Sequence, residues 1–374
     1  MRGVRRLPTL GCLIVVSTFI TSCSSANPCE VPKANVNDSG VSVGVSFDVG
    51  GIGDKSFNDA AKRGLDQAIG QNMLSKATCV EPNQSGSNRD DNTRSLAEDG
   101  ANLVFGVGFA FSPGINGMAA DFPNQDFGVI DGYATCPPDV CTDIKNPAPP
   151  NVLDLDFKEQ EGSYLVGAAA AMEAKKLSCD TVGFLGGQKG FLIGKFETGY
   201  REGVKAVNPD INVLVEYIGD DVTAFNNTTA GEALSTKMYD GGACIIYHAA
   251  GASGAGLFTA AVKADKLAIG VDSDQYQLVS AEQQPHVFTS MIKKVDTAVY
   301  NAIKAQADGS FKGGTAQVFG LAEQGVDYSK SNTTLMTPDI ISALDKFKQQ
   351  IISGQIKVPA CEPDMAWWDK KGCI

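Results

Sequence analysis

Apolar runs and amphipathic stretches alternate along most of the chain. Short, mainly apolar runs occur at 41–48, 77–82, 103–108, 127–131, 152–157, 181–187, 212–219, 243–250, 267–272, 287–292 and 316–321. Stretches with a helical period lie at 57–71, 92–100, 159–177, 294–308 and 338–352. Strands that alternate with helices are typical of βαβ units and parallel sheets. The pattern therefore predicts an α/β protein.

A break rich in Cys and Pro at 136–150 separates two such series, which suggests two lobes around a cleft. The length of 374 residues suits two domains of roughly 100–200 residues each. We expect 41–157 with 273–312 to form one lobe, and 158–272 with 313–374 to form the other. Ligands of open parallel sheets bind beyond the carboxyl ends of the strands, and polar and glycine-rich clusters occur there in this sequence.

The N-terminus has the sequence pattern of a targeting segment. Three arginines within the first six residues precede an uncharged, mainly apolar run over 7–22, which is typical of a secretory signal and short for the roughly 30 Å core of a bilayer. The run ends in ITSC, which resembles the lipobox of bacterial lipoproteins. We therefore expect a signal peptide at 1–22, palmitate or similar acyl chains on Cys23 and a polar tether at 23–40. An ordinary signal peptide with an unmodified cysteine is the alternative.

Composition and charge narrow the classes of function. The formal net charge is −12, and removal of 1–22 would leave 28 basic against 43 acidic residues, or −15. An acidic balance argues against a nucleic-acid partner, because such partners are bound mainly through Lys and Arg. The only histidines, His248 and His286, leave little room for a metal site or an acid–base relay. We expect no metal, no cofactor and no catalytic residues.

Eight cysteines would remain after loss of Cys12 and lipidation of Cys23, and an even number in an exported chain indicates disulfides. Cys136 and Cys141 flank one loop, and Cys361 and Cys373 flank the C-terminal segment, so local bridges are expected in both places. The pairs that remain by elimination are Cys29–Cys79 and Cys179–Cys244. The sequence alone does not fix this connectivity.

One segment is specific enough to indicate a family. The sequence GVSFDVGGIGDKSFNDAAKRGLDQA at 44–68 leaves an expected strand at Asp48, turns through three glycines and enters a helix near Phe57. It resembles the first ligand-binding loop of the basic membrane protein (BMP) family, the lipid-anchored substrate-binding components of ABC transporters best known as purine nucleoside receptors. Further similar segments follow in order, so that the resemblance covers about 41–350: VFGVGFAF, FGVID, VGFLGGQKGFLIGKFETGYREGVKAVNPDI, AFNN, YHAAGASGAG, IGVDSDQ and TSMIKKVDTAVY.

The resemblance implies the type I periplasmic-binding-protein fold, with two Rossmann-like lobes, parallel-sheet cores and a hinged cleft. It also implies aromatic stacking of the ligand, because a flat nucleobase binds well between aromatic rings. Phe57 matches the stacking position of the family. Phe225 is expected to lie opposite it, with Phe109, Phe191 and Phe196 as competing candidates.

Three aspartates close expected strands and match family positions: Asp48, Asp131 and Asp272. Carboxylates at strand ends meet a ligand in a fixed direction and accept hydrogen bonds from base N–H groups and ribose hydroxyls. The resemblance implies that Asp48 and Asp131 bind the edge of the base and that Asp272 binds a ribose hydroxyl.

Further polar positions complete the expected site. Ser56 and Asn58 would add polar contacts, although only one of the two is expected to point inward beside Phe57. Lys293 matches a family lysine on the sugar side, with Lys294 as the alternative, and Gly251 would place backbone N–H groups near the ribose.

These features predict a lipid-anchored substrate-binding protein that takes up a nucleoside, with a purine nucleoside as the expected ligand and an ABC permease as its partner. We expect a monomer at the outer face of the cytoplasmic membrane or facing the periplasm. The same fold with riboflavin, a sugar or an autoinducer as ligand is one alternative. An exported nucleoside hydrolase with aspartates around a metal is the other.

Overall fold

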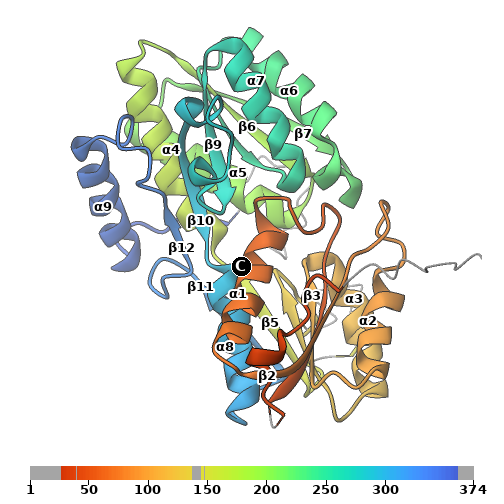
Figure 1. Cartoon of the computed structure of the whole chain (residues 1–374). Helices are drawn as coiled ribbons and strands as arrows, with labels where there is room; N and C mark the ends of the chain where they lie inside the picture. Colours follow the sequence, from red (N-terminus) through yellow and green to blue (C-terminus); the bar gives the residue numbers. More distant parts are fainter. Residues whose placement is uncertain (1–26, 39, 137–144, 147, 361–374) are drawn as a thin grey trace, which may run out of the picture.

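The computed structural model describes residues 27–38, 40–136, 145–146 and 148–360. These residues form two α/β lobes, each built on a six-stranded sheet, and short segments of the chain cross from one lobe to the other (Figure 1). The two sheets therefore confirm the predicted α/β fold class.

The sheet of the first lobe has the strand order β11-β5-β4-β3-β1-β2, and all neighbouring strands are parallel. Its inner strands are continuous apolar runs because helices cover both faces of a parallel sheet; β3 is buried along its whole length. The strands are β1 (Val41–Ser46), β2 (Leu74–Val80), β3 (Leu103–Val107), β4 (Asp126–Ile130), β5 (Val152–Phe157) and β11 (Thr315–Phe319). The helices are α1 (Phe57–Gly70), α2 (Arg89–Glu98), α3 (Ser112–Met118) and α8 (Val295–Ala307).

The sheet of the second lobe has the order β12-β10-β9-β8-β6-β7. Only the edge strand β12 runs antiparallel to its neighbour. The strands are β6 (Thr181–Gln188), β7 (Asn212–Gly219), β8 (Ile245–Ala249), β9 (Leu267–Asp272), β10 (Val287–Lys293) and β12 (Val326–Tyr328). The helices are α4 (Glu159–Lys176), α5 (Phe191–Val207), α6 (Thr228–Asp240), α7 (Ala255–Ala264) and α9 (Pro338–Ile352).

The centre of the second lobe is the close packing of α4 on α5. A Cβ on Gly167 would lie 2.2 Å from the backbone oxygen of Tyr200, and a Cβ on Gly203 would lie 2.0 Å from that of Tyr164. Only glycine fits at such approaches. α4 also contacts α9, β10 and β12, so it is covered on nearly every side, which explains why its sequence is rich in Ala rather than amphipathic.

The division of the chain between the sheets differs from the expected one. β10 was expected in the first lobe and belongs to the second sheet, whereas β11 was expected in the second lobe and belongs to the first sheet. The short strand β12 was not predicted. The cause is that the chain changes lobe after β5, after β10 and after β11, and a buried apolar run does not reveal which sheet it joins.

The three crossings lie side by side and hold one another. The backbone N–H of Lys158 donates to Phe319 O (3.0 Å), and that of Lys294 donates to Gly325 O (2.8 Å). The rings of Phe157 and Phe319 pack with their centroids 5.3 Å apart. This set of contacts forms the hinge between the lobes.

The N-terminal segment is attached to the first lobe from Asn27 onward. Cys29 is bonded to Cys79 of β2, as predicted. The side chain of Asn27 donates to Ala77 O (2.8 Å) and accepts from the backbone N–H groups of Cys29 and Cys79 (3.1 and 3.2 Å). Of the expected tether at 23–40, the part that the structure describes is therefore packed against the lobe rather than free.

The predicted bridge Cys179–Cys244 is also present, and it joins the loop before β6 to the residue before β8. Cys136 is disulfide-bonded, but its expected partner Cys141 lies outside the described residues, as do Cys23, Cys361 and Cys373. Within the described part of the chain, no helix has both the length and the apolar character needed to cross a membrane.

The Cys29–Cys79 bridge closes a loop over a sequence separation of 50. We expect the double substitution Cys29→Ala, Cys79→Ala to lower the free energy of unfolding by about 2–4 kcal/mol, since a cross-link over such a loop restricts the unfolded chain. Urea denaturation of the purified protein measures this. An unchanged midpoint would show that the hydrogen bonds of Asn27 alone hold the segment.

Candidate functional site

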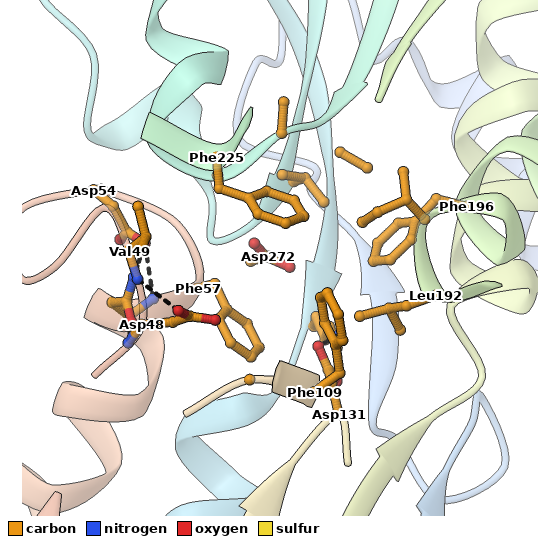
Figure 2. Close-up of a pocket in the computed structure, with 18 residues that line it drawn as sticks. Asp48, Val49, Asp54, Phe57, Phe109, Asp131, Leu192, Phe196, Phe225 and Asp272 are labelled. Carbon is orange, nitrogen blue, oxygen red and sulfur yellow. Dashed lines mark hydrogen bonds and ion pairs between the residues drawn. The ribbon is translucent and has the colours of Figure 1, made fainter. Parts of the chain in front are cut away.

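A cavity lies between the lobes, where strands of both sheets end (Figure 2). The space between the residues that line it is about 580 Å³, including space open to solvent at its mouth. The first lobe contributes Asp48, Val49, Asp54, Phe57, Asn58, Gly108, Phe109 and Asp131. The second lobe contributes Leu192, Ile193, Phe196, Phe225, Ala249, Ala250, Gly251, Val271, Asp272 and Lys293.

Asp54 organises the loop that leads from β1 into α1. Its carboxylate accepts hydrogen bonds from three backbone N–H groups at the start of α1, at 2.8–3.1 Å, groups that would otherwise lack partners at a helix N-terminus. The Asn58 amide donates to Asp54 and accepts from the N–H of Asp48, each at 3.1 Å. Burial raises the pKa of Asp54 to about 6, against the effect of these bonds. The loop is thereby fixed with Phe57 at the cavity.

Asp48 follows β1 and is held through one oxygen only. Its Oδ1 accepts hydrogen bonds from the N–H of Val49 (2.7 Å) and from Nη2 of Arg89 (2.5 Å). Burial raises the pKa of Asp48, while the Arg89 guanidinium opposes that rise. The carboxylate therefore keeps an ionic partner behind it while its side chain faces the cavity.

Two further aspartates enter the cavity from strand ends in an unusual backbone conformation. Asp131 follows β4 with φ of 56°, and Asp272 ends β9 with φ of 63°. Asp tolerates this left-handed region better than most residues. Both positions turn the chain sharply at the carboxyl edge of a sheet, one in each lobe.

Lys293, the last residue of β10, is 1% exposed and lies between two carboxylates. Its Nζ is 2.5 Å from Oδ2 of Asp131 in the first lobe and 2.9 Å from Oε1 of Glu159 in the second. Burial alone would lower the pKa of Lys293, but the neighbouring carboxylates outweigh it and raise that pKa above its usual range. Three rings surround the ammonium with centroids at 5.0–5.3 Å, those of Phe57, Phe157 and Phe196.

Glu159, the first residue of α4, is fully buried between two lysines. Its Oε2 pairs with Nζ of Lys195, which also donates to Phe157 O (2.5 Å). Burial alone would raise the pKa of Glu159, but Lys195 and Lys293 outweigh it and lower that pKa. A chain of alternating charges therefore runs from α5 through the hinge to the cavity.

The lobes contact each other directly beside the cavity. The hydroxyl of Ser56 donates to Oδ2 of Asp272 (2.5 Å), and the hydroxyl of Ser273 donates to Ser56 O (3.1 Å). Nε2 of Gln275 donates to Lys55 O at 3.1 Å. These bonds join the start of α1 in the first lobe to the loop after β9 in the second.

Aromatic rings form much of the cavity wall, and Figure 2 shows the rings of Phe57, Phe109, Phe196 and Phe225 around it. Phe225 belongs to the 3₁₀ helix Val222–Asn226. Glycine at 187 makes room for its ring, because a Cβ there would lie 2.4 Å from Cε1 of Phe225. Gly251 lies beside the same residue with φ of 54°.

Eight of the nine predicted ligand residues line this one cavity, as given above; Ser56 is the exception. It is fully buried and its hydroxyl is used to hold Asp272. The amide of Asn58 is likewise engaged within the loop, although this residue does line the cavity. Of the competing aromatics, Phe109 and Phe196 line the cavity as well, and Phe191 is exposed outside it.

The sequence did not point to Asp54, Arg89, Glu159 or Lys195. Asp54 lies in the polar segment that leads into the helix at Phe57, but the capping position directly before that helix is Ser56, so the usual spacing of a cap does not identify Asp54. The other three act through partners distant in the chain, so no local pattern marks them.

His248 is not part of the cavity wall. It is fully buried, its Nε2 lies 2.9 Å from Oε1 of Gln275, and burial lowers its pKa to about 4. It is a neutral core residue of β8. Among the described residues, no group of three or more His, Cys, Asp or Glu is arranged to hold a metal ion.

Comparison with protein families identifies the class of protein. Residues 41–362 match the family model described as Bmp, ABC transporter substrate-binding protein PnrA-like. The chain belongs to the Bmp family. It is thus a substrate-binding protein of an ABC transporter rather than an enzyme, and the family predicted from the sequence is confirmed.

Known proteins resemble this chain over most of its length. The ABC transporter nucleoside-binding protein BmpA of Lactococcus lactis subsp. cremoris (strain MG1363) is 34% identical over 328 residues, covering 84% of this chain and 87% of the relative. The CD4+ T-cell-stimulating antigen of Listeria monocytogenes serovar 1/2a (strain ATCC BAA-679 / EGD-e) is 31% identical over 365 residues, covering 94% and 97%. A crystal structure of an ABC transporter solute-binding protein from Aeropyrum pernix K1 aligns with a TM-score of 0.71 and 27% identity, over 87% of this chain and 94% of that one.

The buried charges at the hinge give a prediction for stability. We expect Glu159→Gln to lower the free energy of unfolding at pH 7 by about 3–5 kcal/mol, because it leaves two buried ammonium groups short of a partner. The folded pKa of Glu159 is below its usual 4.5, so its contribution is present above pH 4.5 and is lost as the pH falls through the folded value. The difference between variant and wild type should therefore shrink in acid.

Urea denaturation at pH 7 and at successively lower pH measures this difference. Glu232→Gln is the matched control, since it makes the same chemical change in an exposed pair with Lys263 and should cost about 1 kcal/mol or less. Equal effects of the two substitutions would contradict the role given to Glu159.

Proposed function

We propose that this Bmp-family protein is a lipid-anchored receptor that binds a nucleoside in the cavity between its lobes and delivers it to an ABC permease. The observation that carries the proposal is the cavity itself, which combines aromatic walls with carboxylates at its edges. A nucleoside has the matching chemistry, a flat base with N–H groups and a sugar with hydroxyls. The name of the Lactococcus relative, a nucleoside-binding protein, supports the same assignment.

The proposed role of each residue depends on which of its atoms remain available to contact a ligand. Phe57 and Phe225, from opposite lobes, would stack on the base. The free oxygens of Asp48 and Asp131 would accept hydrogen bonds from its edge. Oδ1 of Asp131 is buried and has no hydrogen-bond partner among the described residues. Asp272 would bind ribose hydroxyls, together with Lys293 and the backbone of Gly251. Ser56 and Asn58 support this arrangement through their bonds to Asp272 and to the Asp48 loop.

The charges favour a nucleoside over a nucleotide. Four carboxylates and one ammonium line the cavity: Asp48, Asp54, Asp131, Asp272 and Lys293. A phosphate would bring further negative charge into this partly buried site, where repulsion is screened less than in water.

Ligand binding is the direct test. We expect calorimetry to show binding of at least one of adenosine, guanosine, inosine and cytidine, and no binding of the corresponding monophosphate. Riboflavin and ribose are measured alongside, and mass spectrometry identifies any ligand retained after purification. Binding of riboflavin or ribose, with no response to any nucleoside, would refute the proposed ligand while leaving the family assignment intact.

The stacking role predicts the effect of one substitution. Phe57→Ala should weaken nucleoside binding by about 1–3 kcal/mol, the range for loss of one base–aromatic stack. Phe122→Ala is the control, because Phe122 packs on Phe127 inside the first lobe and does not line the cavity. Equal affinity of wild type and Phe57→Ala would place the base elsewhere.

The anchor is tested separately. If Cys23 carries acyl chains, the protein produced in bacteria should incorporate labelled palmitate and fractionate with membranes, because acyl burial contributes about 0.8 kcal/mol per CH₂. Cys23→Ser should abolish incorporation of the label. A wild-type protein that takes up no palmitate and is released from the membrane would instead favour an ordinary signal peptide.

A further inference from the structure

Arg89 lies directly behind the cavity wall without being part of it. Its Nη2 is 2.5 Å from Oδ1 of Asp48, and the two side chains are 12% and 11% exposed. The guanidinium is fixed on two other sides: Nη1 donates to Gly86 O (3.2 Å), and Cζ lies 5.1 Å from the ring centroid of Phe111. The cavity is lined by Asp48 but not by Arg89.

Arg89 occupies a helix position that is usually unfavourable for a cation. It is the first residue of α2 and is followed by Asp90 and Asp91. Acidic residues are favoured in the first turn of a helix, and a cation there is opposed by the helix dipole. The fully buried ring of Phe111 and the carboxylate of Asp48 account for a cation at this place.

Arg89 decides which oxygen of Asp48 is available. The N–H of Val49 and Nη2 of Arg89 both donate to Oδ1. The structure records no partner for Oδ2 among the described residues, and a Cβ on Gly108 would approach this oxygen to 2.7 Å. One oxygen is thus anchored, and the other is left as an acceptor at the cavity.

We propose that Arg89 is a positioning residue for ligand recognition, which keeps Asp48 as a carboxylate and presents its Oδ2 to an N–H or O–H donor of the ligand. The proposal rests on the proposed function, because it assigns Asp48 to contact the ligand. Arg89 itself does not touch the ligand.

The protonation state of Asp48 depends on this pair. Burial raises the pKa of Asp48, and the charge and hydrogen bond of Arg89 are what oppose the rise. The remaining charged groups around the same cavity are Asp54 on the same loop, Asp131 from the β4 end, and Asp272 and Lys293 from the second lobe. Three of these four are acids. Without Arg89, Asp48 would therefore take up a proton at a higher pH and would then offer a donor where the ligand needs an acceptor.

The experiment compares Arg89→Met with Arg89→Lys, which keeps the positive charge. Arg94→Met is the matched control. Arg94 lies on the same helix, pairs with Asp121 at 2.8 Å and packs over the ring of Phe122 at 5.3 Å, but its pair is exposed and is not part of the cavity wall. Folding of each variant is checked by its thermal unfolding.

Two measurements are made on each variant between pH 5.5 and 8.5. The first is the titration of the Asp48 carboxyl by carbon NMR without ligand. We expect its midpoint to move to higher pH in Arg89→Met and to stay near the wild-type value in Arg89→Lys and Arg94→Met. The second is the Kd of the nucleoside that binds the wild type. It should rise about tenfold or more in Arg89→Met at the acid end of the range, consistent with loss of a charge-assisted hydrogen bond, and recover as the pH is raised.

The two measurements distinguish a failure of the role proposed for Arg89 from a failure of the proposed nucleoside-binding function. A shifted Asp48 midpoint in a protein that binds no nucleoside at any pH would refute the proposed function while supporting the pairing of Arg89 with Asp48. Nucleoside binding whose pH dependence is the same in Arg89→Met and wild type would overturn the positioning role. A loss of affinity that is equal at every pH would also overturn it, since it would show only a structural effect.

Discussion

The ammonium group of Lys293 is buried where the two lobes meet, and a buried charge is stable only when it is paired. Its partners come from different parts of the fold: Asp131 follows β4 in the first lobe, and Glu159 begins α4 in the second. Glu159 is in turn balanced by Lys195 from α5. The relative position of the lobes, the start of α4 and the floor of the cavity therefore depend on one set of charges.

The carboxylates that line the cavity differ in how many of their oxygens are already hydrogen-bonded. Both oxygens of Asp54 are occupied by the first turn of α1. Asp48, Asp131 and Asp272 are each anchored through one oxygen, by Arg89, Lys293 and Ser56 respectively. One oxygen then remains on each for a donor. Three anchored carboxylates with one free oxygen apiece make a site that requires several donors in fixed directions, and leaving any of these oxygens unpaired in a buried site is costly.

The fold and much of the cavity could be predicted from the sequence, because strands and their ends leave local signals in it. Buried parallel strands are apolar runs in the sequence, and Asp48, Asp131 and Asp272 were predicted because each closes such a run and matches a position of the family that the sequence resembles. The sequence could not predict which sheet β10 joins and which sheet β11 joins, since strand pairing depends on contacts between distant segments. Arg89 and Glu159 were missed for the same reason. Ser56 was assigned to the ligand because its position beside Phe57 is visible in the sequence, whereas its bond to Asp272 in the other lobe is not.

The charges at the hinge are divided unequally between the lobes, and this bears on how the cleft opens. Lys293, Glu159 and Lys195 all belong to the second lobe, and only Asp131 belongs to the first. Rotation about the three crossings would break the pair of Lys293 with Asp131 but would leave its pair with Glu159 intact. The lysine would thus keep a counter-ion if the cleft opened. Asp131 would gain solvation as it separated from Lys293, so that neither charge would be left buried and unpaired, and opening would avoid the several kcal/mol that an unpaired buried ion costs.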